Sequence, residues 1–271
     1  MRVLVLQQVA CEPPGVYADV LDEHDVELAV VEAGGAGRPL DWRAFDGIVA
    51  MGGPTSANDL LDEQRLIGDA VRAGKAFFGV CLGAQLLAAS FGAAVRVARL
   101  PEIGMLPVLR TAEGDADAVF ARTPHELPAF HWHSDTFELP EGGVLLWTSE
   151  ACRNQAFRVG SHAYGVQFHL EATAPMVRRW ARLPEYGASL ERVGGARVLP
   201  GLLADLERHE PELQRSARAV LTGWIEHCLV PAAISKPGEV PASRPSENDG
   251  AWDPTVFTRS PSTSDRSSPR S

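Results

Sequence analysis

The sequence predicts an α/β fold in which a mostly parallel sheet is flanked by helices. Short continuous apolar runs alternate with longer amphipathic stretches, and glycine closes several of the helical stretches. Apolar residues make up 45% of the chain and charged residues 22%, which is ordinary for a globular protein. Apolar strands that alternate with helices indicate a sheet that is buried on both faces.

The expected elements follow in chain order. Strands are predicted at 3–6, 26–31, 45–51 and 76–80, and helices at 16–24, 59–73 and 82–91. After Val95 the pattern changes to shorter strands, predicted at 105–110, 143–148, 155–159 and 164–168. Two helical stretches, 175–186 and 202–228, follow, and the second carries an apolar stripe typical of a packed helix.

The chain divides into one folded domain, 1–234, and a tail, 235–271. The tail is rich in Ser and Pro and has no apolar periodicity, so we expect it to be disordered. Its five basic and five acidic residues cancel, so the net charge of −10 belongs to the folded part.

Composition also excludes several classes of protein. The acidic charge argues against a nucleic-acid partner, because phosphate binding requires clustered Lys and Arg. No apolar run approaches the roughly 18 residues of a membrane span, and no signal peptide is evident. Four widely spaced cysteines form neither a disulfide framework nor a zinc ribbon, so we expect a cytoplasmic protein.

The segment Gly79-Val80-Cys81-Leu82-Gly83 is the most informative part of the sequence. It follows a predicted strand and opens a predicted helix, which is the cysteine version of a nucleophile elbow. The helix N-terminus would direct N–H groups at the sulfur and favour the thiolate. We therefore interpret Cys81 as a nucleophile rather than a buried structural cysteine.

A second segment supplies a base for this thiol. His169 follows a predicted strand, and Glu171 lies two residues later, on the same side of an extended chain. The carboxylate can hold one ring nitrogen while the other faces the sulfur, which is the logic of a catalytic triad.

Two other features have competing interpretations. The strand that ends at Gly52-Gly53-Pro54 could offer backbone N–H groups which, with that of Leu82, form an oxyanion hole, or it could be a plain turn. His131 and His133 have the spacing of a metal pair, but no third ligand is evident in the sequence, so we expect neither a metal ion nor a cofactor.

Together, these motifs resemble class I (triad-type) glutamine amidotransferases, and especially stand-alone members similar to the amidotransferase domain of GMP synthase. The residues that carry the resemblance are the elbow with Gln85, the Gly52-Gly53-Pro54 turn and Gly165-Val166-Gln167-Phe168-His169-Leu170-Glu171, with support from 102–104, 131–137 and 154–157. The resemblance covers 1–185 and leaves a helical extension, 186–234, without a match.

The resemblance implies a flavodoxin-like amidotransferase fold and a role for each motif residue. Cys81 would be the nucleophile, His169 the general base and acid, and Glu171 the group that orients His169. Gly53 and Leu82 would form the oxyanion hole. Substrate would be held by Gln85 and by a loop at 132–135 that includes Trp132, Ser134 and Asp135.

The sequence also departs from this family in two places. Leu170 stands where the family usually has Pro, which leaves the triad in place but predicts a less rigid loop. Met105 stands where the subgroup usually has Trp.

Three functions remain open on the sequence. One is hydrolysis of glutamine, with ammonia passed to a separate synthase, since the chain has no glycine-rich ATP-binding loop of its own. Another is hydrolysis of γ-glutamyl peptides by the same triad. The third, a non-catalytic regulatory module, is disfavoured by the intact Cys81, His169 and Glu171.

Overall fold

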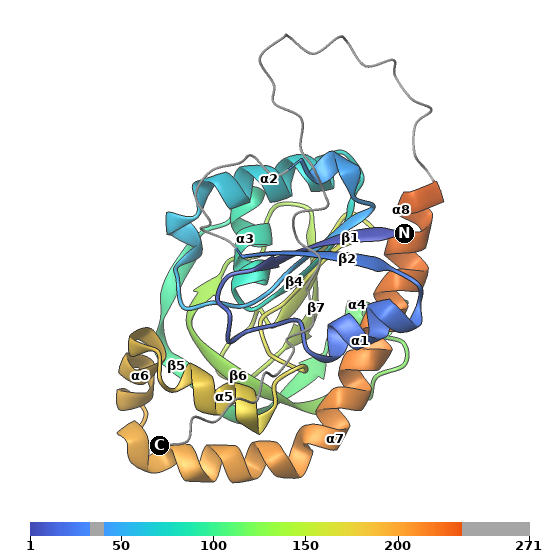
Figure 1. Cartoon of the computed structure of the whole chain (residues 1–271). Helices are drawn as coiled ribbons and strands as arrows, with labels where there is room; N and C mark the ends of the chain where they lie inside the picture. Colours follow the sequence, from blue (N-terminus) through green and yellow to red (C-terminus); the bar gives the residue numbers. More distant parts are fainter. Residues whose placement is uncertain (33–40, 235–271) are drawn as a thin grey trace, which may run out of the picture. The chain divides into compact units, whose positions relative to one another are not determined.

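The computed structural model describes residues 1–32 and 41–234, which belong to one compact unit. The predicted tail, 235–271, lies outside the described residues. The described strands form one nine-stranded sheet in the order β2-β1-β3-β4-β9-β8-β7-β5-β6, with helices packed around it (Figure 1).

Half of the sheet is parallel, and it contains the four strands predicted before Val95. Its strands are β1 (Arg2–Gln7), β2 (Glu27–Glu32), β3 (Gly47–Ala50), β4 (Ala76–Val80) and β9 (Ala163–Val166). Alternate residues of these strands enter two apolar clusters on opposite faces, with Val3 and Val5 in one and Leu4 and Leu6 in the other. The continuous apolar runs thus reflect burial on both faces.

The other half is antiparallel, so the prediction of a mostly parallel sheet is wrong and the sheet is mixed. The strands are β5 (Val95–Arg110), β6 (Glu126–Phe137), β7 (Gly143–Thr148) and β8 (Ala156–Val159). Parallel neighbours need a crossover of a dozen or more residues, and the connections between β7, β8 and β9 are too short for one.

The largest error in the predicted secondary structure is the absence of strand β6. Its apolar run, 127–130, contains Pro128 and is followed by mixed polar and apolar residues, and no strand was predicted there. β6 pairs with β5, which is also longer than predicted and contains a register shift between Val97 and Glu102.

Helices cover both faces of the sheet. Helices α2 (Leu61–Arg72) and α3 (Leu82–Ser90) contribute to one apolar cluster, whereas α1 (Val16–Glu23), α5 (Ala174–Trp180) and α7 (Leu199–Trp224) contribute to the other. The remaining helical elements are α4 (Ala112–Asp115), α6 (Pro184–Glu191), η1 (Trp42–Ala44), η2 (Ala57–Asp59), η3 (Gly195–Val198), η4 (Ile225–Leu229) and α8 (Val230–Ile234).

The stretch predicted as one helix at 175–186 is two helices, α5 and α6. Leu183, in extended conformation, separates them, and Pro184 opens α6. Proline fixes its own backbone for the first helical turn but disfavours helical conformation in the residue before it. This break directs α6 along a new path, toward the site described below.

The apolar stripe predicted in 202–228 is confirmed. Its buried members are Leu203, Leu206, Leu213, Val220, Leu221 and Ile225, whereas Leu202 is partly exposed. Trp224 is fully buried, and its indole N–H donates to the carbonyl of Phe77 in β4 over 3.0 Å. Figure 1 shows α7 turning near its middle, where Pro211 lies inside the helix.

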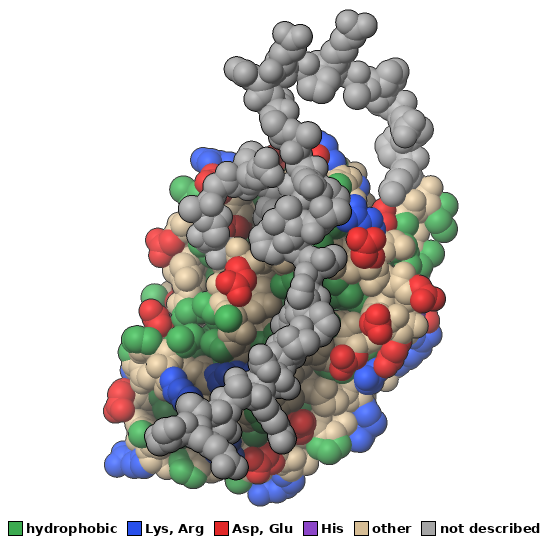
Figure 2. Space-filling model, viewed as in Figure 1, with side chains coloured by type: hydrophobic (Ala, Val, Ile, Leu, Met, Phe, Trp, Pro, Cys, Tyr) green, Lys and Arg blue, Asp and Glu red, His purple; other side chains and the backbone are tan. Residues whose placement is uncertain are grey.

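The surface of the described residues has no strongly basic face in the view of Figure 2. Acidic and basic side chains are scattered among apolar and uncharged ones there. None of the helices in the described ranges is long and apolar enough to cross a membrane.

Candidate active site

Cys81 lies at the sharp corner between β4 and α3. Its backbone has φ +51° and ψ −104°, a conformation that L residues rarely adopt, and its N–H donates to the carbonyl of Val166 over 2.7 Å. A Cβ at Gly79 would lie 2.5 Å from the backbone of Gly83, so the corner requires glycine at this position. This is the strand–turn–helix context that the sequence predicts.

His169 and Glu171 form a buried pair. The Nδ1 of His169 lies 2.7 Å from Oε1 of Glu171, and both side chains are at most 2% exposed. The backbone of His169 bridges to Phe130 of β6, and its ring packs against Trp180 with 4.9 Å between centroids. The pair therefore forms with Leu170 in place of proline, and its imidazole is held from several sides.

Gly52 lies where Cys81 and His169 meet. A Cβ at Gly52 would be 3.5 Å from Cβ of Cys81 and 3.1 Å from Cε1 of His169, and would clash with the carboxylate of Glu12. Glycine thus allows the thiol and the imidazole to approach on one side of β3.

The electrostatics of this group favour a charged imidazole. Burial alone would lower the pKa of His169, but the charges of Glu171 and Cys81, with the hydrogen bond to Glu171, raise the pKa well above its usual value. The imidazolium would in turn stabilise a thiolate, which the net negative charge of the protein opposes.

Glu12 is a buried acid beside this pair that the sequence analysis missed. Burial raises the pKa of Glu12 to about 7, against the opposing charge of His169 and a hydrogen bond donated by Tyr186. Its other carboxylate oxygen has no hydrogen-bond partner among the described residues. No motif surrounds Glu12 in the sequence, and only the fold brings it here.

Gln167 connects the thiol to one of the predicted substrate-binding residues. Its amide nitrogen lies 3.5 Å from Sγ of Cys81, and its oxygen accepts a hydrogen bond from Gln85 over 3.1 Å. The same Gln85 nitrogen lies 3.3 Å from the carbonyl of Asp135. Gln85 thus links the backbone of β6 at Asp135 to Gln167, which lies beside the thiol of Cys81.

The segment 132–135 is part of strand β6, not the loop that was predicted. The indole N–H of Trp132 donates to Ser189 of α6 over 2.8 Å, and Asp135 accepts a hydrogen bond from Ser56 over 3.1 Å. Trp132, His133 and Asp135 pair with residues of β5, and the register shift of β5 lies opposite Ser134.

A cavity of about 200 Å³ opens beside Cys81 and brings most of the predicted site together. Its lining residues are Gly53, Pro54, Thr55, Ser56, Cys81, Gln85, Trp132, His133, Ser134, Asp135, Glu185, Tyr186 and Ser189. Leu82, the other predicted oxyanion residue, begins α3, and a Cβ at Gly53 would lie 3.2 Å from its side chain. The structure thus places Leu82 beside Gly53, which lines the cavity.

Helix α6 contributes residues that the sequence did not single out. Glu185, Tyr186 and Ser189 line the cavity, although most of α6 lies in the extension for which no motif was found. Their only sequence signal is Pro184, which opens a new helix.

Glu102 lies beside His131 and His133, the two histidines whose spacing is that of a metal pair. Its Oε2 lies 3.0 Å from Nε2 of His133 and 3.9 Å from Nδ1 of His131. β5 thus supplies, from a distant part of the sequence, a third side chain that can bind a metal ion together with His131 and His133.

Comparison with known proteins identifies the family. Residues 18–176 match the model of the class I glutamine amidotransferases. A glutamine amidotransferase-like protein of Salmonella typhimurium, YfeJ, is 33% identical over 188 residues, which are 65% of this chain and 78% of that protein. The A subunit of the glutamine-hydrolysing GMP synthase of Thermoplasma volcanium is 34% identical over 155 residues, 56% of this chain and 74% of that protein.

Solved structures agree with this match. A glutamine amidotransferase of Thermotoga maritima superposes with a TM-score of 0.71 at 31% identity, over 83% of this chain and 98% of the other. One of Methylobacillus flagellatus gives 0.75 at 31% identity, over 90% and 99%. With the strained cysteine at the strand–helix corner, these matches show that the chain belongs to the class I glutamine amidotransferase family.

Proposed function

We propose that this chain hydrolyses the side-chain amide of glutamine, with Cys81 as nucleophile, His169 as general base and acid, and Glu171 as the residue that orients His169. The observation that carries the proposal is that the strained Cys81, which lines a cavity, and the buried His169–Glu171 pair meet at Gly52. A nucleophile, a base and a group that orients the base are the parts that acyl transfer requires.

The reaction follows from these positions. The thiolate of Cys81 attacks the side-chain amide carbon, and the proton held by His169 passes to the departing nitrogen, which leaves as ammonia. A γ-glutamyl thioester remains on Cys81. Water then attacks this thioester while His169 accepts its proton, and glutamate and the thiolate are released.

The negative oxygen of each tetrahedral intermediate needs donors on the opposite side of the carbon from the imidazole. We assign this role to the backbone N–H groups of Gly53, which lines the cavity, and of Leu82, which lies beside it and follows Cys81 in the chain. Leu82 also stands at the N-terminus of α3, where the helix dipole favours negative charge.

The cavity lining suits the amino-acid end of the substrate. It contains the carboxylates of Glu185 and Asp135 but no Lys or Arg among its described residues. We assign Glu185 to the α-ammonium group, because Asp135 already accepts a hydrogen bond from Ser56. The α-carboxylate would then be held by hydroxyl and backbone donors near Ser134, while Gln85 and Trp132 keep β6 in position.

We further propose that the ammonia is used by a separate synthase. The similarity to the Thermoplasma volcanium protein, whose name describes one part of a glutamine-hydrolysing GMP synthase, supports this partner class. All four cysteines are free, which fits a thiol nucleophile kept reduced in the cytoplasm.

A substrate panel tests the proposal. Purified full-length chain is given glutamine or γ-glutamyl dipeptides, each with the Glu185→Gln variant and, as a control, Glu150→Gln at an exposed position. We expect glutamate and ammonia from glutamine, a higher KM in Glu185→Gln, and unchanged kinetics in Glu150→Gln. Turnover of dipeptides without turnover of glutamine would instead identify a γ-glutamyl peptide hydrolase, and turnover of neither would indicate a regulatory module.

A further inference from the structure

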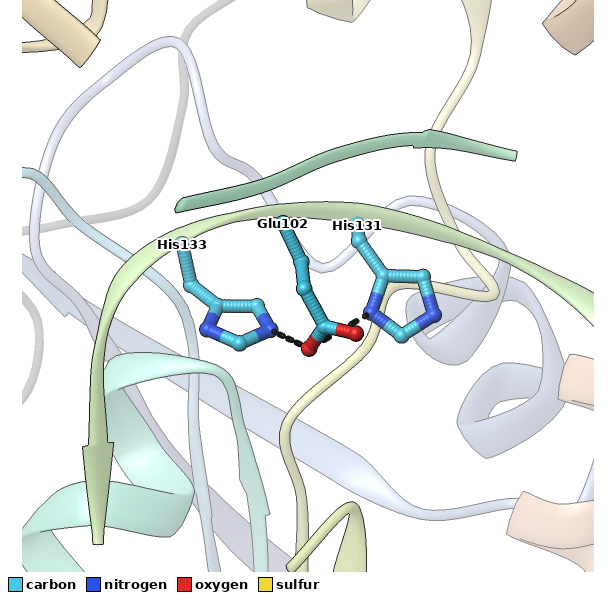
Figure 3. Close-up of side chains that lie close together, drawn as sticks. All are labelled: Glu102, His131 and His133. Atoms are coloured by element: carbon cyan, nitrogen blue, oxygen red, sulfur yellow. Dashed lines mark ion pairs between the residues drawn. The ribbon is translucent and has the colours of Figure 1, made fainter. Parts of the chain in front are cut away.

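Three residues with metal-binding side chains gather on one face of the β5–β6 hairpin. Glu102 pairs directly with His133 in the register of the two strands, and His131 lies two residues before His133. All three side chains therefore project from the same face, with one ligand atom of each within 4.8 Å of the others (Figure 3). The cluster is outside the Cys81–His169–Glu171 group.

One ring nitrogen of His133 faces a carboxylate. Its Nδ1 lies 2.9 Å from the carbonyl of Asp135, which can only accept, so Nδ1 carries a proton. Nε2, the nitrogen that can offer a lone pair to a metal ion, lies 3.0 Å from Oε2 of Glu102. The direction from Nε2 does not fit a hydrogen bond to this oxygen, and neither ring nitrogen of His131 has a hydrogen-bond partner among the described residues.

Buried electron-pair donors that face one another without hydrogen bonds are costly unless a cation joins them. His131 is fully buried, and His133 and Glu102 are 4% and 6% exposed.

The surroundings orient Glu102 and His133 as the outer groups of a metal site do. Gln155 donates to Oε2 of Glu102 over 2.7 Å, and Ser149 donates to Oε1 over 3.0 Å. The bond from His133 to the carbonyl of Asp135 fixes the ring and its tautomer. Backbone carbonyls and amide or hydroxyl donors commonly hold ligating histidines and carboxylates in this way.

We propose that Glu102, His131 and His133 bind one divalent transition-metal ion of the zinc class. Two nitrogen ligands and one carboxylate oxygen are a set that zinc accepts, with a fourth position left for water. Ligand atoms about 2.1 Å from a tetrahedral ion lie roughly 3.4 Å apart. The distances from Oε2 of Glu102 to His133 and His131, 3.0 and 3.9 Å, bracket this value.

The ion would fasten β6 to β5 behind the cavity. His133 itself lines the cavity, which gives an ion a route to the site, and its neighbours Trp132 and Ser134 face the proposed substrate position. The site is thus a structural support for the cavity wall, and it does not depend on whether Cys81 hydrolyses glutamine.

Metal titration of the full-length chain tests the proposal. The protein is stripped with a chelator and titrated with Zn²⁺ against a chromogenic competitor, and with Co²⁺ for its absorption spectrum. Because Cys81 and His169 could themselves hold zinc, Cys81→Ser is titrated in parallel. Glu102→Gln and His131→Asn test the ligands, and His125→Asn, at an exposed histidine beside Asp115, is the matched control.

We expect one zinc ion per chain in wild type, Cys81→Ser and His125→Asn, with affinity at least about 100-fold weaker in Glu102→Gln and His131→Asn. The cobalt form should show visible bands of a four-coordinate ion without a thiolate charge-transfer band. Zinc should also raise the Tm of the wild type. The proposal would be overturned if folded wild type did not bind one zinc ion per chain. It would also be overturned if Cys81→Ser lost zinc binding, or if Glu102→Gln bound zinc with unchanged affinity.

Discussion

Nδ1 of His169 lies 2.7 Å from Oε1 of Glu171, inside a protein core from which solvent is excluded. This contact fixes the tautomer and direction of the imidazole, so that its Nε2 is the atom available to the thiol of Cys81. Charge and geometry therefore act together, since the same carboxylate also raises the pKa of His169.

Glu171→Gln tests this relationship. The amide keeps the size of the side chain but removes the charge and allows the wrong ring tautomer, so we expect kcat for glutamine to fall about 10³–10⁴-fold. Stopped or coupled ammonia assays measure this, with Glu150→Gln as the exposed control. A kcat within about twofold of wild type would show that Glu171 does not orient His169.

Gly79→Ala tests the strained corner. The added Cβ would lie 2.5 Å from backbone atoms of Gly83, so β4 and α3 must separate. We expect a loss of about 1–3 kcal/mol in the free energy of unfolding and a marked loss of activity. Gly201→Ala, in α7 with open space around its Cβ, should instead stabilise the protein by up to about 1 kcal/mol. Equal effects of the two substitutions in urea unfolding would contradict this account of the corner.

Glu12→Gln tests the buried acid beside His169. The pKa of Glu12 is raised to about 7, so its protonated form contributes stability that is complete below the unfolded pKa, near 4.5, and is lost as pH rises through 7. The Gln side chain of the variant does not ionise, so the variant does not lose this stability as the pH rises. The variant should therefore gain about 2 kcal/mol relative to wild type between pH 5 and pH 8.

Urea unfolding of both proteins at the two pH values measures this difference. Effects of all other titrating groups cancel to first order in the comparison, provided that His169 behaves alike in both. A constant difference between pH 5 and pH 8 would mean that the carboxyl of Glu12 does not titrate in this window.

Leu213→Ala tests the packing of α7. Leu213 is fully buried in the apolar cluster, so its truncation should cost about 2–5 kcal/mol. Leu61→Ala, at a position that is 55% exposed, should change the free energy of unfolding by less than about 0.5 kcal/mol. Similar small effects at both positions would show that α7 is not part of the core.

The sequence predicted the residues whose chemistry depends on local context. Cys81 was identified because glycines, a strand and a helix surround it in consecutive residues, and His169 and Glu171 because they are close in the chain. Apolar patterns likewise predicted the parallel strands and the buried stripe of α7, since each of these elements carries its own pattern of apolar residues.

What could not be predicted depends on pairing between distant segments. The polar residues of β6 have strand partners only because β5 lies beside them, and Glu102 reaches His133 only through that register. Glu12 and Glu185 approach the site through the paths of loops and of α6, for which the sequence carries no motif. The connections among β7, β8 and β9, in contrast, are short enough in the sequence to indicate that these strands are antiparallel.

The most direct test of the central claim is the rate at which glutamine is converted to glutamate and ammonia by wild type, Cys81→Ala and Cys228→Ala. Cys228 is a second buried free cysteine, located in η4, and controls for loss of a thiol from the core. The account predicts that Cys81→Ala loses at least about 10³-fold in kcat and that Cys228→Ala keeps most of it. Turnover by Cys81→Ala at the wild-type rate would contradict it.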